Sequence, residues 1–195
     1  YLQNLKTFDE RIKGLKKLRV IGRGGDDLST RVSFFGFDPG KIVILTRGAG
    51  LSGAVLAARL RTEYRIELEM AGPDYAVAMT SICDEAEHFA RLADALIAID
   101  ATAKKSIVKA SALPPIPAAA LTASEAVGYK GVFTEPYRAA GRTALEYVWV
   151  YPPGIPLLVP GEIVTDEHIE LLSRYAAEGI AVKSTKGRLP DLYTS

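Results

Sequence analysis

The sequence predicts a mixed α/β protein: a small layered β-α-β-β-α domain, then a proline-rich linker and a C-terminal α+β region. A β-branched run at 41–46 is followed at 51–64 by apolar residues with helical spacing. The texture changes to prolines and alanines between 101 and 121, which is typical of a linker. We therefore expect a small α/β domain with an N-terminal connecting helix at 1–100, a linker at 101–121 and a C-terminal domain at 122–195.

The composition sets the class of protein. With 195 residues, 48% hydrophobic and 24% charged, the chain is long enough for one or two compact domains. A net charge of +1 gives no electrostatic reason to expect nucleic acid or an anionic membrane as partner. Cys83 is the one cysteine, so an internal disulfide or a cysteine-based zinc site is excluded. No apolar run is long enough for a bilayer, and we expect a cytoplasmic protein.

The first domain is expected to begin with a helix, because apolar residues recur every three or four positions, at Leu2, Leu5, Phe8, Ile12 and Leu15. A glycine-rich loop at 22–27 and a short strand at 34–37 come next. Strand patterns at 41–46, 66–70 and 75–80 flank the helix at 51–64. Asp84 and Glu87 have the spacing of a capping box for a further helix that continues to Ile99.

In the C-terminal region, Thr122 and Glu125 form a second capping pair, before strands near 129–133 and 146–151. Thr165 is expected to cap the last helix, which ends before Gly179. Three apolar positions of that helix are expected to face the core: Ile169, Leu172 and Tyr175.

Residues 140–162 carry the most information. After the strand pattern that ends at Tyr151, prolines and glycines alternate with apolar residues, at Pro152, Pro153, Gly154, Pro156 and Pro160. Each proline fixes its own φ and restricts the residue before it, so we expect a rigid, extended loop rather than a helix or a central strand. Such a loop would hold the Glu162 carboxylate in a fixed place, or it is simply an apolar strap over the core.

The run GRTALEYVWVYPPGIPLLVPGEIVTDEHI at 141–169 resembles the C-terminal signature of the Orn/Lys/Arg decarboxylase family, in which a YPPGxPLxxPGExIT pattern recurs. Residues 38–84 and the linker segment PPIPAAALTASEA are also similar to this family, so the resemblance extends from about residue 38 to residue 187. It implies a pyridoxal-phosphate enzyme that decarboxylates ornithine, lysine or arginine to a polyamine-type amine.

The resemblance also implies what this chain lacks. In the family, the lysine that holds pyridoxal phosphate lies in a Ser-x-His-Lys type segment, and no His-Lys dipeptide occurs here. The chain starts at Tyr1 in the middle of a helical pattern, and we expect it to be a fragment whose cofactor domain lies N-terminal to it. The chain alone is then expected to be inactive. Its implied partners are the N-terminal pyridoxal-phosphate domain of the same protein, a second copy in a homodimer or higher homo-oligomer, and a small basic amino acid.

Three residues are candidates for contact with that substrate, whereas no catalytic, cofactor-binding or metal-binding residue is assigned to this chain. Glu162 would face the distal amine or guanidinium, because a partly buried cation needs an anionic partner. The alternative is that Glu162 braces the helix that starts near Thr165. Arg142 would pair with a carboxylate or tie its segment to the core, and Tyr151 is the third candidate.

Two other function classes stay open. Gly48, Gly50 and Gly53 form a GxGxxG pattern between a strand and a helix, which is typical of dinucleotide binding. The strands at 66–70 and 75–80 are joined by a short turn and not by a crossover helix, which favours a simple tight turn. A non-catalytic interaction module with the decarboxylase C-terminal fold is the other class. His88 and His168 lack metal-ligand spacing, and we expect both on solvated helix faces.

Overall fold

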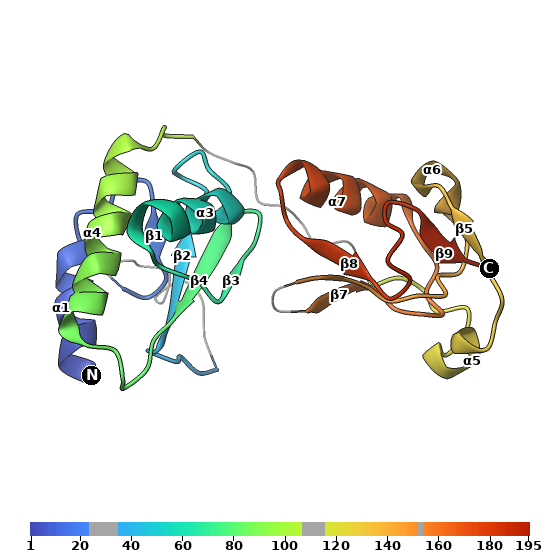
Figure 1. The fold of residues 1–195 in the computed structure, drawn as a ribbon, viewed down its shortest axis with the longest axis horizontal. Helices are drawn as coiled ribbons and strands as arrows, with labels where there is room; N and C mark the ends of the chain where they lie inside the picture. Colours follow the sequence, from blue (N-terminus) through green and yellow to red (C-terminus); the bar gives the residue numbers. More distant parts are fainter. Residues whose placement is uncertain (24–34, 107–115, 152–153) are drawn as a thin grey trace. The chain divides into compact units, whose positions relative to one another are not determined.

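The computed structural model describes residues 1–23, 35–106, 116–151 and 154–195 (Figure 1). The chain divides into two compact units, residues 1–111 and 112–195, which are described separately. The domain boundaries expected at 100 and 121 stay a prediction.

Unit 1 has the predicted β-α-β-β-α order, preceded by one helix and one short strand. Its elements are α1 (Leu2–Ile12), β1 (Arg19–Val20), β2 (Lys41–Leu45), α3 (Gly53–Tyr64), β3 (Met70–Ala71), β4 (Tyr75–Met79) and α4 (Ala86–Thr102). All pairings in the sheet are antiparallel, in the order β1-β2-β4-β3. The strand expected at 66–70 is reduced to the two residues of β3.

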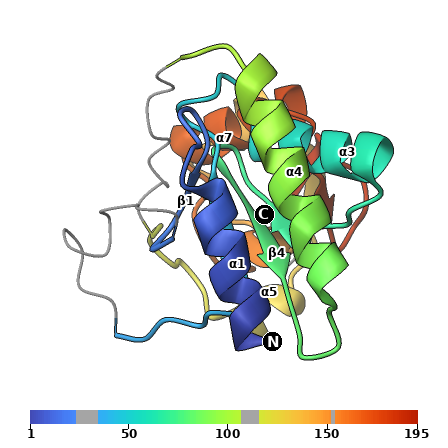
Figure 2. The same ribbon diagram turned by 90° about the vertical axis from the view of Figure 1, so that its left-hand side faces the viewer.

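The core of unit 1 lies between the sheet and its helices. Ile42 and Ile44 of β2 point to the same face, because strand side chains alternate, and both are fully buried. They pair across the sheet with Ala78 and Ala76, and the small alanines leave room for the apolar faces of the helices. Figure 2 shows α1 and α4 side by side in front of the sheet. Burial of these faces supplies the main driving force for folding of the unit.

A buried carboxylate fixes the chain between α1 and β1. Asp100, on the last turn of α4, accepts main-chain hydrogen bonds from Lys16 (3.0 Å), Lys17 (2.7 Å) and Leu18 (2.7 Å). Lys17 Nζ returns a hydrogen bond to the Asp100 carbonyl at 2.7 Å. The buried charge is therefore satisfied by three main-chain donors.

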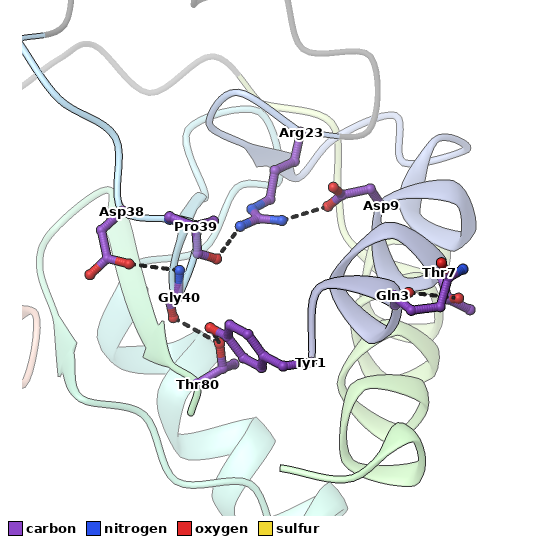
Figure 3. A network of polar contacts seen from close by, with 9 residues as sticks. All are labelled: Tyr1, Gln3, Thr7, Asp9, Arg23, Asp38, Pro39, Gly40 and Thr80. Atoms are coloured by element: carbon purple, nitrogen blue, oxygen red, sulfur yellow. Dashed lines mark hydrogen bonds and ion pairs between the residues drawn. The ribbon is translucent and has the colours of Figure 1, made fainter. Parts of the chain in front are cut away.

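A second polar cluster ties α1 to the segment before β2 (Figure 3). The buried Arg23 forms an ion pair with Asp9 at 2.8 Å and donates to the Pro39 carbonyl. The start of α1 is fixed separately, since the Tyr1 hydroxyl lies 3.0 Å from Thr80 Oγ1. The strand expected at 34–37 is not found at 35–37, and Phe34, like 24–27 of the predicted loop, lies outside the described residues.

The cap of α4 differs from the prediction. Glu85, not Asp84, is the N-cap residue, and its N–H donates to Nδ1 of His88 at 3.2 Å. Asp84 instead accepts from the Ser81 N–H at 2.7 Å and closes the preceding turn. Two acidic residues in succession made both assignments possible from sequence.

Unit 2 contains α5 (Ala123–Val127), β5 (Val132–Thr134), α6 (Pro136–Ala139), β6 (Val148–Val150), β7 (Ile155–Leu158), α7 (Asp166–Ala177), β8 (Val182–Ser184) and β9 (Leu192–Thr194). The strands form two small antiparallel sheets, β5-β9 and β7-β6-β8. The core comprises Ala139, Ala144, Val148, Leu158, Val164 and Leu192. The Thr122–Glu125 capping box is confirmed.

The segment after Tyr151 includes a strand where the sequence predicted only an extended loop. β7 pairs with β6 and lies at the edge of its sheet, with Pro156 opposite Trp149. An edge position tolerates proline, because one side of the strand needs no N–H donor. The sequence also predicted that this segment would not be a central strand, and the sheet order β7-β6-β8 agrees with that prediction.

Within the described residues, no helix is long and apolar enough to cross a membrane.

Candidate functional site

The carboxylate predicted to meet the substrate lies in a tight turn, 159–162, directly after β7. The Glu162 N–H donates to the Val159 carbonyl at 3.1 Å, and Glu162 Oε2 accepts from the Val159 N–H at 2.7 Å. Pro160 and Gly161 occupy the two central positions, and Gly161 has a φ of +97°. This residue pair is typical of a type II turn. Two hydrogen bonds thus join Val159 and Glu162, the first and last residues of the turn, and one of them holds the Glu162 carboxylate in place.

Gly161 is required at this position for two reasons. Its positive φ lies in a region that residues other than glycine rarely adopt. In addition, a Cβ on Gly161 would lie 2.2 Å from the Leu121 carbonyl oxygen. The Ala120 N–H donates to the Gly161 carbonyl at 2.8 Å. The end of the predicted linker therefore packs directly on the turn that carries Glu162.

The half-buried Glu162 has a titratable neighbour in α7, His168. Burial lowers the pKa of His168, and the negative charges of Glu162 and Glu167 oppose that shift. Glu162 therefore lies close enough to influence the start of α7 electrostatically. Among the described residues, none donates a hydrogen bond to Glu162 Oε1, so this oxygen is available to a ligand.

His168 is buried, with 1% of its surface exposed, and the expectation of a solvated histidine was wrong for it. Its Nδ1 accepts from the Thr165 N–H at 3.2 Å, so the ring folds back over the first turn of α7 and completes the Thr165 cap. His88 makes the equivalent contact at α4 but stays half-exposed. Both histidines thus serve as capping partners, at the position that glutamate usually takes in a capping box.

Arg142 lies on a segment that pairs with the turn region. Its carbonyl accepts from the Val164 N–H at 2.9 Å, and its Nε donates to Thr194 Oγ1 at 2.8 Å. Thr194 is fully buried and is also hydrogen-bonded to Thr134 at 2.8 Å. The expectation that Arg142 ties its segment to the core agrees with this contact, which leaves the two terminal nitrogens of the guanidinium for another partner.

Arg142 is one of the residues that line an open pocket of about 700 Å³ in unit 2. Its lining comprises Val132, Phe133, Thr134, Glu135, Arg138, Arg142, Arg188 and Asp191. Sequence reasoning missed Arg138 and Arg188. Arg138 lies in α6, which was not predicted, and Arg188 lies between β8 and β9, which were also not predicted. The four-residue spacing of Arg138 and Arg142 was the one signal available in the sequence.

Tyr151 follows β6 and is half-exposed. Its N–H donates to the Ala181 carbonyl at 3.0 Å, and Lys183 Nζ lies 4.5 Å from the centre of its ring. The ring therefore already attracts an ammonium group.

Of the three candidate residues, Arg142 and Glu162 lie on neighbouring backbone segments. Thr143 pairs with Ile163, so Arg142 and Glu162 lie on adjacent antiparallel segments. Their side chains make separate contacts, Arg142 with Thr194 and Glu162 with Val159. Within the described ranges, no hydrogen bond, ion pair or ring contact joins Tyr151 to either residue. Contact of the three with one substrate stays a prediction.

The glycine pattern at 48–53 has a structural explanation within unit 1. A Cβ on Gly53 would lie 1.8 Å from the Tyr75 carbonyl oxygen, so α3 can approach β4 only with glycine there. The flanking strand β2 has only antiparallel neighbours, whereas the dinucleotide fingerprint belongs to a parallel βαβ unit. Ser52 also caps α3, because its Oγ accepts from the Val55 N–H at 3.2 Å. The pattern is therefore a packing feature.

Pyridoxal phosphate requires a lysine, a carboxylate and a phosphate cup together, and three of the described lysines have contacts within this chain. Lys17 Nζ donates to the Asp100 carbonyl, and the ammonium groups of Lys183 and Lys186 lie over tyrosine rings. We assign no step of the cofactor's chemistry to these three lysines. In the part of the chain that the structure describes, no cluster of three or more His, Cys, Asp or Glu could hold a metal ion.

Comparison with known proteins gives matches of three kinds: a protein family, relatives in sequence and solved structures. Residues 100–185 match the family described as Orn/Lys/Arg decarboxylase, C-terminal domain. Over 189 residues the chain is 30% identical to an arginine decarboxylase of Bacillus subtilis (strain 168), covering 93% of this chain and 38% of that protein. It is 31% identical over 154 residues to an arginine decarboxylase of Bacillus anthracis, covering 76% of this chain and 31% of that protein.

Solved structures of lysine decarboxylases share the fold. The Francisella novicida enzyme matches 98% of this chain and 38% of its own, with a TM-score of 0.68 and 18% identity. The constitutive enzyme of E. coli matches 99% of this chain and 39% of its own, with a TM-score of 0.67 and 15% identity. Identities this low show the fold alone. The domain match and the arginine decarboxylase relatives show that the chain belongs to the Orn/Lys/Arg decarboxylase family, as part of its C-terminal region.

Proposed function

We propose that this chain is the C-terminal part of a pyridoxal-phosphate-dependent decarboxylase that converts ornithine, lysine or arginine into carbon dioxide and a polyamine-type amine. The observation that carries the proposal is the alignment of 93% of this chain with a protein named arginine decarboxylase. The chain spans 38% of that relative, so the activity belongs to a longer protein. Arginine is the first substrate to test, because the curated relatives carry that name.

Pyridoxal phosphate, when bound, supplies the electron sink for loss of the carboxylate. We place its lysine and phosphate cup in an N-terminal domain of the same protein, and expect the present chain to be inactive alone. A homodimer or higher homo-oligomer in the cytoplasm is part of the proposal. The chain's own residues bind and orient the substrate and pack on the cofactor domain.

Glu162 is the proposed partner of the substrate's distal ammonium or guanidinium group. Three features support this role: the turn holds the carboxylate still, the side chain is half-buried, and Oε1 is available. A carboxylate in such a place attracts a cation strongly, because partial burial weakens the screening by water. A fixed carboxylate also loses little conformational entropy when it binds.

Tyr151 and Arg142 are also proposed to contact the substrate. The Tyr151 ring already carries the Lys183 ammonium at 4.5 Å, so it suits the cationic end of a basic amino acid. Arg142 suits the other end, because guanidinium groups pair with carboxylates.

Two experiments test the proposal. The first measures carbon dioxide release from arginine, lysine and ornithine by a protein that joins this chain to its cofactor domain. Release from at least one of them is expected, and release from none would contradict the proposal. The second titrates this chain with pyridoxal phosphate and with NAD, followed by the fluorescence of Trp149, its one tryptophan. Neither is expected to bind. The carbon dioxide assay also distinguishes the enzyme hypothesis from the hypothesis of a non-catalytic interaction module, because such a module would release no carbon dioxide.

A further inference from the structure

The pocket in unit 2 holds more positive charge than its own carboxylates neutralise. Three arginines and two acids line it, Arg138, Arg142, Arg188, Glu135 and Asp191. Within the described residues, neither Arg138 nor Arg142 forms an ion pair with a carboxylate. Like charges gathered at one site repel each other, so an anion that enters the pocket gains energy from all of them.

Each of the two acids already has a partner, Glu135 in Tyr137 and Asp191 in Arg188. Glu135 interacts with the Tyr137 hydroxyl, which raises the pKa of that tyrosine. Asp191 lies 4.0 Å from Arg188 Nε, at the outer limit of an ion pair, and its N–H donates to the Arg188 carbonyl at 3.1 Å. Arg188 in turn lies over the Phe133 ring, 4.7 Å from its centre. The stacking sets the plane of this guanidinium at the pocket wall.

The guanidinium of Arg142 is anchored to a buried residue. Its Nε is bonded to the buried Thr194 at 2.8 Å, and Thr194 is bonded to Thr134 of the pocket wall. This arrangement fixes one edge of the guanidinium and leaves both terminal nitrogens, which form the side that binds oxyanions in a bidentate way. The site is therefore preorganised around Arg142 and completed by the exposed Arg138 and Arg188.

We propose that Arg138, Arg142 and Arg188 form a binding site for a phosphate group, either free phosphate or a small phosphate ester. Three guanidinium groups suit a doubly charged tetrahedral oxyanion better than a single carboxylate, because each can donate to a different oxygen. The volume of about 700 Å³ leaves space for an organic group on the phosphate. A basic amino acid fits less well, since its own cationic groups meet three positive charges.

This inference does not rest on the decarboxylase function, but it competes with the proposed contact between Arg142 and the substrate's carboxylate. The test therefore uses the present chain, without cofactor. Nuclear magnetic resonance follows the arginine Nε–Hε signals during titration with inorganic phosphate, glycerol 3-phosphate, malonate and arginine, at constant ionic strength. Saturable shifts at Arg142 are expected with inorganic phosphate, glycerol 3-phosphate or both. Tighter binding of the ester would identify an organic phosphate as the ligand, and equal binding would identify free phosphate.

Matched variants locate the site. Arg138→Gln removes an exposed cation whose guanidinium lies over the exposed Tyr137 ring, and it is expected to weaken phosphate binding about tenfold, a free-energy difference of about 1.4 kcal/mol. Arg142→Lys keeps the charge but loses the bidentate geometry, and is expected to weaken it similarly. Lys130→Gln removes one exposed charge of the same unit outside the pocket and is the control, with unchanged affinity expected.

Three outcomes would overturn the proposal. The first is a linear, unsaturable response to phosphate that is the same in Arg138→Gln. The second is malonate binding as tightly as phosphate, which would make the pocket a general carboxylate site. The third is displacement of phosphate by arginine, which would assign the pocket to the substrate. Carbon dioxide release by the longer protein is measured separately, so failure of the phosphate site and failure of the decarboxylase function can be told apart.

Discussion

Thr165 donates its main-chain N–H to Nδ1 of the buried His168 at 3.2 Å, and its hydroxyl lies 2.9 Å from the same nitrogen. The N–H can only donate to an unprotonated Nδ1, so this contact requires the neutral imidazole. The N-cap of α7, three residues after Glu162, therefore depends on the protonation state of one histidine.

Acid is expected to destabilise unit 2 through His168. Burial lowers the pKa of His168 from 6.5, its ordinary value, while Glu162 and Glu167 oppose part of that shift. Between the two pKa values the unfolded chain binds more protons, so the free energy of unfolding falls as the pH is lowered through about 6.5. Urea unfolding between about pH 8 and about pH 5, followed by Trp149 fluorescence, measures this.

Comparison of two histidine variants isolates the contribution of His168 to the pH dependence of stability. His168→Gln is expected to flatten the pH dependence above about pH 5, because glutamine does not titrate. His88→Gln is the control at the half-exposed capping histidine of α4, and should leave the dependence as in the wild type. Equal pH dependence in the wild type and His168→Gln would refute the assignment.

Asp100→Asn is expected to destabilise unit 1 by about 3 kcal/mol, because the buried carboxylate accepts three main-chain hydrogen bonds and an amide presents donors to the same N–H groups. Asp94→Asn on the same helix is the matched control. Asp94 is exposed and pairs only with Arg11, so its loss should cost less than about 1 kcal/mol. Urea unfolding followed by circular dichroism measures both. Similar losses in the two variants would show that Asp100 does not anchor the 16–18 segment.

Gly161→Ala is expected to lower the stability of unit 2 by more than about 3 kcal/mol, because it combines a positive φ with a clash at the Leu121 carbonyl. Gly141→Ala separates the two causes. Gly141 has a φ of +80° but no atom within 4 Å of a Cβ, so only the backbone strain of about 1 kcal/mol remains. The prediction fails if thermal unfolding gives the two variants equal midpoints.

The sequence predicted the regular parts of the fold because their apolar periods are long. α4 continues for 17 residues, and its apolar positions Phe89, Leu92, Leu96 and Ile99 are buried as expected. β8 and β9 were missed because three residues are too few to show a period, and only pairing with β6 and β5 makes them strands. β7 was missed because prolines conceal an edge strand.

The candidate site was only partly predictable for a related reason. The prolines and glycine around Glu162 are neighbours in sequence, so their rigidity is visible there. Arg138, Arg142 and Arg188 meet only because β5 and β9 pair, and no local pattern indicates contact between residues fifty positions apart. His168 has the sequence context of a surface histidine, and its burial follows from its capping contact with Thr165.

The role of Glu162 is tested most directly by steady-state kinetics of arginine decarboxylation in the protein that joins this chain to its cofactor domain. Glu162→Gln keeps an oxygen that accepts from the Val159 N–H but removes the charge. The neighbouring, exposed Glu167 provides the control Glu167→Gln. We predict that Glu162→Gln raises KM for arginine at least about tenfold, or about 1.4 kcal/mol, while Glu167→Gln leaves it unchanged. An unchanged KM in a folded Glu162→Gln enzyme would contradict the account.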